Sequence, residues 1–203
     1  MGVPAQVYII RHGEKLGDPS DDRGGGRDLS IRGAARAVAL TSLFAPAQYQ
    51  TDQLSCALAT PGPCFAGSYV PVTIPGTRPR FATPDFIVAT SQSRHSNRPV
   101  ETIAPLKSAL RLSEDHFDDT RPDDEYSAVA SDILTAPKYA DKVVLICWHH
   151  GKIPALAAKL GIDPQPSRWL DDVFDLVWQI TWPGGRAGLT VHRQMLVYGD
   201  STG

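Results

Sequence analysis

The 203-residue sequence has few cysteines, no long apolar run and no excess of charge of one sign. Its three cysteines, Cys56, Cys64 and Cys147, are too few and odd in number for a disulfide scaffold. No apolar run approaches the roughly 18 residues of a membrane-spanning helix, so we expect no membrane contact. Basic and acidic side chains number 20 and 22, a formal net charge of −2, which argues against a broad nucleic-acid-binding surface.

The amino terminus lacks a recognisable targeting segment as well. Residues 1–6 carry no basic stretch followed by an apolar core, so no secretion signal is expected and a cytoplasmic location is predicted. With 42% hydrophobic residues, a chain of this length can bury a sizeable core without metal or disulfide staples. We therefore expect a single domain over residues 1–203.

Three short apolar runs, at 7–10, 86–89 and 143–148, read as buried strands of a parallel sheet. Between them lie apolar residues at helical spacing and residues typical of helix caps. Near the end, a turn signal at 183–186 separates two segments in which apolar and polar residues alternate. This order predicts a three-layer α/β/α sandwich with a mostly parallel central sheet, helices on both faces and an antiparallel edge hairpin. The expected helices are 30–44, 99–110, 126–134 and 153–160, and the expected hairpin strands are 173–182 and 189–198.

Two segments depart from this regular pattern. Residues 46–84 contain seven prolines, too many for a regular helix or central strand, and are predicted to be an insertion that could cover a site. Residues 114–125 are rich in aspartate and glutamate and are interpreted as a solvated face.

Polar residues follow each predicted strand. Because the carboxyl ends of parallel strands meet at one edge of an open α/β sheet, these residues are expected to form one pocket. Arginine matches phosphate oxygens with two parallel hydrogen bonds, and a neutral imidazole can attack phosphorus to form a covalent intermediate. The combination predicts phosphoryl transfer that needs no metal ion. The residues concerned are Arg11 and His12, Arg98, and His149 and His150.

Four motifs together resemble those of the histidine phosphatase superfamily, also called phosphoglycerate mutase-like. The tetrapeptide 11–14 resembles the Arg-His-Gly signature after the first strand, and 98–102 resembles the second arginine motif, with Thr four residues after Arg. Residues 143–151 resemble the strand that delivers a second histidine, and 29–37 resemble the helix start that follows the signature.

The resemblance implies His12 as the nucleophile, with Arg11 and Arg98 as phosphate ligands. The second histidine is ambiguous, because either His149 or His150 fits one way of counting along the motif. Their side chains point in opposite directions, so only one can face the phosphate. His150 is preferred as the catalytic residue. The other histidine is expected to pack into the sheet or to lie at the rim of the pocket, and His149 is grouped with Arg11 and Arg98 as a phosphate-binding residue.

The same resemblance implies a carboxyl group that protonates the leaving oxygen. Glu125 is the preferred donor because it follows Arg98 by 27 residues, and Asp123 and Asp124 compete with it. Only 52 residues separate Arg98 from His150, which favours a compact phosphatase over a mutase.

The predicted function is therefore a metal-independent phosphatase that hydrolyses a phosphomonoester through a phosphohistidine intermediate, with no cofactor. The expected substrate is a phosphorylated small molecule or phosphoprotein, with inorganic phosphate as product. A mutase-like phosphotransferase and a non-catalytic module that binds a phosphorylated ligand on the same fold are the alternatives.

Overall fold

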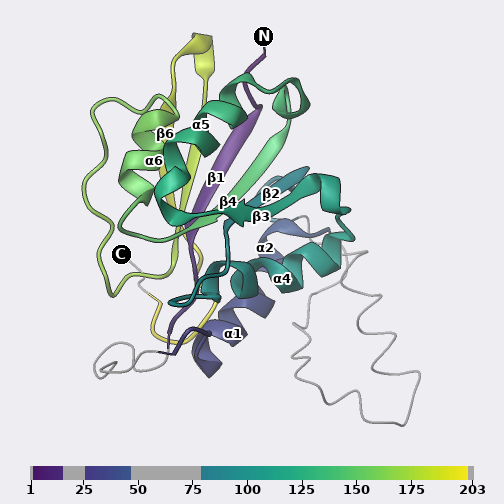
Figure 1. Cartoon of the computed structure of the whole chain (residues 1–203), viewed down its shortest axis with the longest axis vertical. Helices are drawn as coiled ribbons and strands as arrows, with labels where there is room; N and C mark the ends of the chain where they lie inside the picture. The colour runs from purple at the N-terminus through teal and green to yellow at the C-terminus, as the bar shows by residue number, and fades with distance from the viewer. Residues whose placement is uncertain (1, 16–25, 47–78, 201–203) are drawn as a thin grey trace.

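A six-stranded mixed sheet forms the centre of the computed structural model, which describes residues 2–15, 26–46 and 79–200 (Figure 1). Its strand order is β3-β2-β4-β1-β5-β6, in which β3, β2, β4 and β1 are parallel and β5 and β6 form an antiparallel hairpin against β1. The strands are β1 (Gln6–Arg11), β2 (Phe86–Thr90), β3 (Phe117–Arg121), β4 (Val143–Trp148), β5 (Leu176–Thr181) and β6 (Gly188–Arg193).

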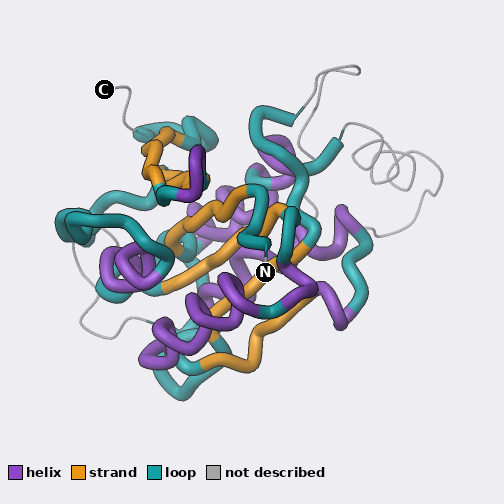
Figure 2. The backbone as a smooth tube through the Cα atoms, turned by 90° about the horizontal axis from the view of Figure 1, so that it is seen from above, coloured by secondary structure: helices purple, strands orange, loops and turns teal. Residues whose placement is uncertain are grey.

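Helices cover both faces of this sheet, as the view from above shows (Figure 2). On one face lie α1 (Ile31–Ala39), α2 (Thr41–Phe44) and α4 (Arg98–Leu110), and on the other lie α5 (Tyr126–Thr135) and α6 (Ile153–Lys159). Alternate residues of β1 and β4 feed two separate cores, because successive strand side chains point to opposite faces. The predicted three-layer α/β/α architecture is confirmed.

The expected helix over 30–44 is divided in two at Leu40. Ser30 caps α1 as predicted, since its hydroxyl accepts the Gly33 N–H at 3.0 Å. Near the break, the Thr41 hydroxyl donates to the Val38 carbonyl at 2.8 Å. Side-chain hydroxyls of this kind compete with backbone hydrogen bonds and interrupt helices.

The acidic segment 114–125 holds the edge strand β3, which the sequence pattern did not predict. Aspartate disfavours strands, but an edge strand tolerates and even benefits from charge because charge blocks pairing with other chains. Asp118 is partnered within the strand, where its carboxylate accepts the Thr120 hydroxyl at 2.6 Å. Of the predicted 46–84 insertion, residues 47–78 lie outside the described part of the chain, and so do Cys56 and Cys64.

Within the described ranges, none of the helices combines the length and apolar character needed to cross a bilayer.

Candidate active site

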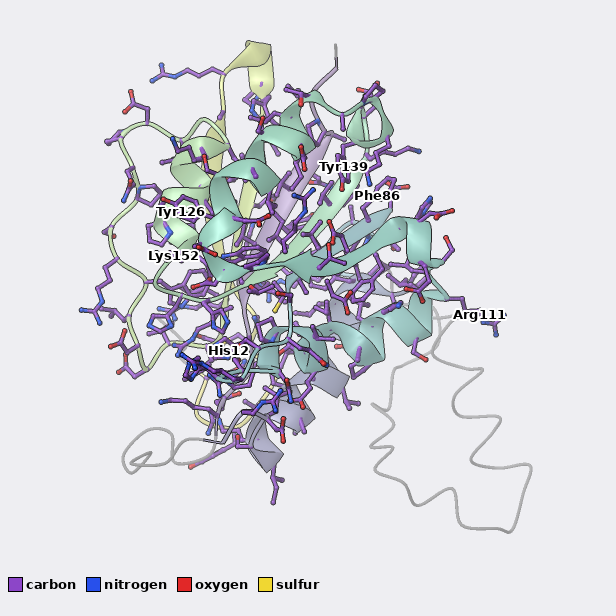
Figure 3. All side chains as sticks on the ribbon, viewed as in Figure 1. His12, Phe86, Arg111, Tyr126, Tyr139 and Lys152 are labelled. Atoms are coloured by element: carbon purple, nitrogen blue, oxygen red, sulfur yellow. The ribbon has the colours of Figure 1, made fainter. Side chains whose placement is uncertain are left out.

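Two histidines meet at the carboxyl ends of the neighbouring parallel strands β1 and β4. The register pairs Arg11 with Trp148, so His12 and His149 are the next residues of each strand end. Their ring centroids lie 5.0 Å apart with the planes inclined by 70°. Figure 3 shows His12 at the lower end of β1, beyond the sheet. Pairing of these strands thus places two imidazoles in contact from positions far apart in the sequence.

The imidazole of His12 is held in one tautomer by its own backbone. Its Nδ1 lies 2.7 Å from the Gly13 carbonyl oxygen, and since a carbonyl can only accept, Nδ1 carries the proton. Burial of the ring lowers the pKa of His12 well below its usual range, and His149 and Arg11 lower it further. The ring is therefore neutral near pH 7 and its Nε2 presents a free lone pair.

Gly13 is itself held by helix α4. Its N–H donates to the Thr102 hydroxyl oxygen at 2.8 Å, and that hydroxyl donates to the Arg98 carbonyl at 2.7 Å. Arg98 is the first residue of α4, and its Nη1 donates to the Gly26 carbonyl at 2.6 Å. The second arginine motif and the His12 segment are thus hydrogen-bonded to each other.

Close backbone packing explains the glycine of the helix-start motif. A Cβ placed on Gly33 would overlap the Glu14 backbone, and one placed on Gly13 would come within 2.9 Å of the Gly33 carbonyl oxygen. The Ser30 N–H also donates to the Glu14 carbonyl at 2.9 Å. The start of α1 therefore fixes the chain directly after His12.

A buried charge network fixes the same segment from the side-chain direction. Arg36, 1% exposed, donates to the Glu14 carboxylate at 2.7 Å and to the Asp200 carboxylate at 2.6 Å. Burial opposes ionisation of Glu14, but the bonds from Arg36 and Arg32 outweigh it and lower the pKa of Glu14. Asp200 belongs to the segment after β6, so the carboxyl-terminal residues help to hold the His12 segment.

The segment before β5 positions Arg11. The Nη1 of Arg11 donates to the carbonyls of Leu170, Asp171 and Val173. Its guanidinium carbon lies 3.6 Å from the centre of the Phe174 ring, a cation–π contact. No local motif signals these partners, because they lie about 160 residues from Arg11 and meet it only in the fold.

The two adjacent histidines have different surroundings. His149 faces His12, and burial with the nearby Arg98 lowers its pKa to about 4. The Nε2 of His150 lies 2.9 Å from a carboxylate oxygen of Asp171, and burial together with the nearby Arg11 lowers the pKa of His150. The histidine beside His12 is thus His149, whereas the sequence had favoured His150 for this position. The reason is strand alternation, since His149 follows Leu145 and Cys147 on one face of β4.

The expected proton donor, Glu125, is not positioned as a buried acid. Its side chain is 46% exposed and lies 3.5 Å from the Arg121 guanidinium. Asp123 is half-buried instead, and the Trp148 indole N–H donates to its backbone carbonyl at 3.2 Å. Burial raises the pKa of Asp123, opposed in part by Lys152. Of the two carboxyl groups, that of Asp123 is therefore the more buried, and its segment contacts the indole of Trp148, the residue before His149.

The assembled groups fit an oxyanion. Arg11 and Arg98 supply permanent positive charge near two imidazoles, since both arginines lower the pKa values of His12 and His149, and this is chemistry that suits a negatively charged oxygen group. Among the described residues, no three histidine, cysteine, aspartate or glutamate side chains gather as a metal site.

The sequence and the structure were each compared with known proteins. No family model matches the sequence, and no curated protein does. The structure is similar to the protein histidine phosphatase SixA, solved with tungstate, at 13% identity and a TM-score of 0.55, covering 93% of this chain and 97% of that one. It is also similar to mycobacterial hydrolase 2, at 14% identity and a TM-score of 0.52, covering 98% and 94%. These likenesses support the predicted fold.

Proposed function

We propose that this chain is a metal-independent phosphatase that forms a phosphohistidine at His12. The observation that carries the proposal is the 2.7 Å contact between His12 Nδ1 and the Gly13 carbonyl. This contact leaves the opposite nitrogen, Nε2, unprotonated in a pocket flanked by Arg11, Arg98 and His149. A neutral, oriented imidazole among cationic groups is what in-line attack on a phosphate monoester requires.

In the first step, Nε2 of His12 forms a bond to phosphorus as the bond between phosphorus and the ester oxygen breaks. The leaving oxygen takes a proton, and the alcohol departs. In the second step, a water oxygen attacks the phosphorus of the phosphohistidine, the phosphorus–nitrogen bond breaks, and inorganic phosphate leaves. The Nδ1 proton stays on the ring throughout, directed at the Gly13 carbonyl.

Arg11 and Arg98 hold the non-bridging oxygens of the transferred group, whose charge is spread over them in the transition state. His149 is neutral near pH 7 because its pKa is lowered to about 4. A bound phosphate dianion favours its protonated form, so His149 becomes a further positive donor when substrate arrives.

Asp123 serves as the proton donor to the leaving oxygen in this scheme. Burial raises the pKa of Asp123, which favours the protonated form that a donor needs. The same carboxyl, once ionised, can take a proton from the attacking water in the second step. Small phosphomonoesters and phosphoproteins are both compatible substrates.

The proposal is tested with a generic aryl phosphate in the presence of EDTA. Turnover by the wild-type protein that continues in the chelator, and that is lost in His12→Ala, is the expected result. Turnover that persists in His12→Ala rules out the phosphohistidine. Phosphate binding without turnover of any ester supports the non-catalytic module instead.

A further inference from the structure

One buried hydroxyl group connects three elements of the candidate site. Thr102 is 0% exposed in helix α4 and touches the segment after β1 and the start of its own helix. The Cys147 thiol of β4, two residues before His149, also interacts with it. We propose that Thr102 is a positioning residue that holds His12 in its reactive tautomer, an inference that rests on the proposed function.

The hydrogen bonds at Thr102 leave no ambiguity in their direction. The Gly13 N–H can only donate, so the hydroxyl oxygen accepts it at 2.8 Å. The Arg98 carbonyl can only accept, so the hydroxyl proton points to it at 2.7 Å. Both partners are therefore satisfied by one group, and only serine among the other residues could reproduce both bonds from this position.

The orientation of Gly13 passes directly to His12. The N–H of Gly13 is held by Thr102, while its carbonyl oxygen accepts the His12 Nδ1 proton at 2.7 Å. Without the hydroxyl, the buried Gly13 N–H has no acceptor, and the free energy falls if the peptide turns so that this N–H can bond to water. That turn moves the Gly13 carbonyl away from Nδ1, so no hydrogen bond then favours the tautomer that carries its proton on Nδ1.

The chain offers a matched control in Thr90 on β2. It is also buried, at 2% exposed, but its hydroxyl oxygen has no hydrogen-bond partner among the described residues. Replacing either threonine by valine exchanges a hydroxyl for a methyl group of similar size. Thr102→Val removes the hydrogen bonds to Gly13 and Arg98 together with the interaction with the Cys147 thiol, whereas Thr90→Val removes no hydrogen bond to a described residue.

The test compares Thr102→Val, Thr102→Ser and Thr90→Val by aryl phosphatase kinetics and by ¹⁵N NMR of the histidine rings. We expect Thr102→Val to lower kcat by about tenfold or more, since small displacements of a reacting group cost up to about a hundredfold, with little change in KM. His12 should lose its pure Nδ1–H tautomer in this variant. Thr102→Ser and Thr90→Val should keep both kcat and the tautomer.

Equal kcat and an unchanged tautomer in Thr102→Val and Thr90→Val would overturn the inference. If Thr102→Val does not fold, Thr102→Ala against Thr102→Ser isolates the hydroxyl on a background without the methyl group, with the same expectations. A wild-type protein that hydrolyses no phosphoester contradicts the proposed function alone, because the tautomer comparison still decides the role of Thr102.

Discussion

His12 and His149 stand with their ring centroids 5.0 Å apart at the carboxyl ends of two adjacent parallel strands. They share one face of the sheet because Arg11 pairs with Trp148 and the next residue of each strand turns to the same side. His149 is therefore the histidine whose ring lies against that of His12.

The two neighbouring histidines should respond differently to the same substitution. His149→Gln removes a donor that becomes charged against the bound phosphate, and we expect kcat/KM to fall by about a hundredfold or more. His150→Gln changes a contact with the Asp171 carboxylate, which is 63% exposed and also pairs with Arg168, and should cost less than about tenfold. Steady-state kinetics of both variants decide between them. A larger loss in His150→Gln would restore the assignment favoured by the sequence.

The lowered histidine pKa values make stability depend on acid pH. The pKa of His149 is about 4 in the folded protein and close to its ordinary value of 6.5 when unfolded. As pH falls below 6.5 the unfolded chain binds the proton first, so the free energy of unfolding decreases until about pH 4. The slope should approach about 1.4 kcal/mol per pH unit for this group.

Urea titrations between pH 7 and pH 4 measure this dependence. In His149→Gln the free energy of unfolding should fall less steeply with decreasing pH than in the wild type. The difference in slope should correspond to at most one bound proton, and His12 should still contribute in the same direction in both proteins. Identical slopes in the two proteins would mean that His149 is not buried in its neutral form.

The role of Asp123 should depend on the leaving group. Asp123→Asn removes a proton donor that an alkyl phosphate needs and an aryl phosphate with an acidic phenol does not. We expect a loss of about 10²–10⁴-fold with the alkyl ester and a much smaller loss with the aryl ester. Glu125→Gln is the matched control, since that side chain is 46% exposed and pairs with Arg121. An equal effect of both variants on both substrates would exclude Asp123 as the acid.

The contact between Gly33 and the Glu14 backbone should tolerate no side chain. In Gly33→Ala the added Cβ overlaps Glu14, so helix α1 or the His12 segment must move. We expect a stability loss of about 1–3 kcal/mol, typical of overpacking, together with reduced kcat. Gly188→Ala is the control, because its Cβ would meet only the Thr181 carbonyl oxygen at 3.9 Å. Thermal unfolding of the two variants compares them directly.

Five of the six described strands, and the helices that cover them, could be predicted from the sequence because each depends on a local pattern. Strand β1 with its Arg-His-Gly ending, and Arg98 at a helix start, can be recognised without knowing what lies beside them. The choice between His149 and His150 could not be made in this way. It depends on the register between β1 and β4, which pairs residues 137 positions apart (Arg11 with Trp148).

The same limit applies to the remaining site residues. Asp123 and Glu125 differ in burial and in their partners, which a run of acidic residues does not reveal. Strand β3 was missed because its aspartates read as surface, and they are tolerated only because the strand lies at the sheet edge. The carbonyl groups that hold Arg11 belong to a loop with no sequence signature at all.

The central claim is that His12 becomes covalently phosphorylated. Rapid mixing of the protein with an aryl phosphate, followed by quenching in alkali and peptide mass spectrometry, tests it most directly, because phosphohistidine survives alkali and is lost in acid. We predict an added phosphoryl group on the peptide containing His12, formed as quickly as the phenol is released and absent in His12→Asn. Phenol release with no phosphoryl group on that peptide at any time would contradict the account.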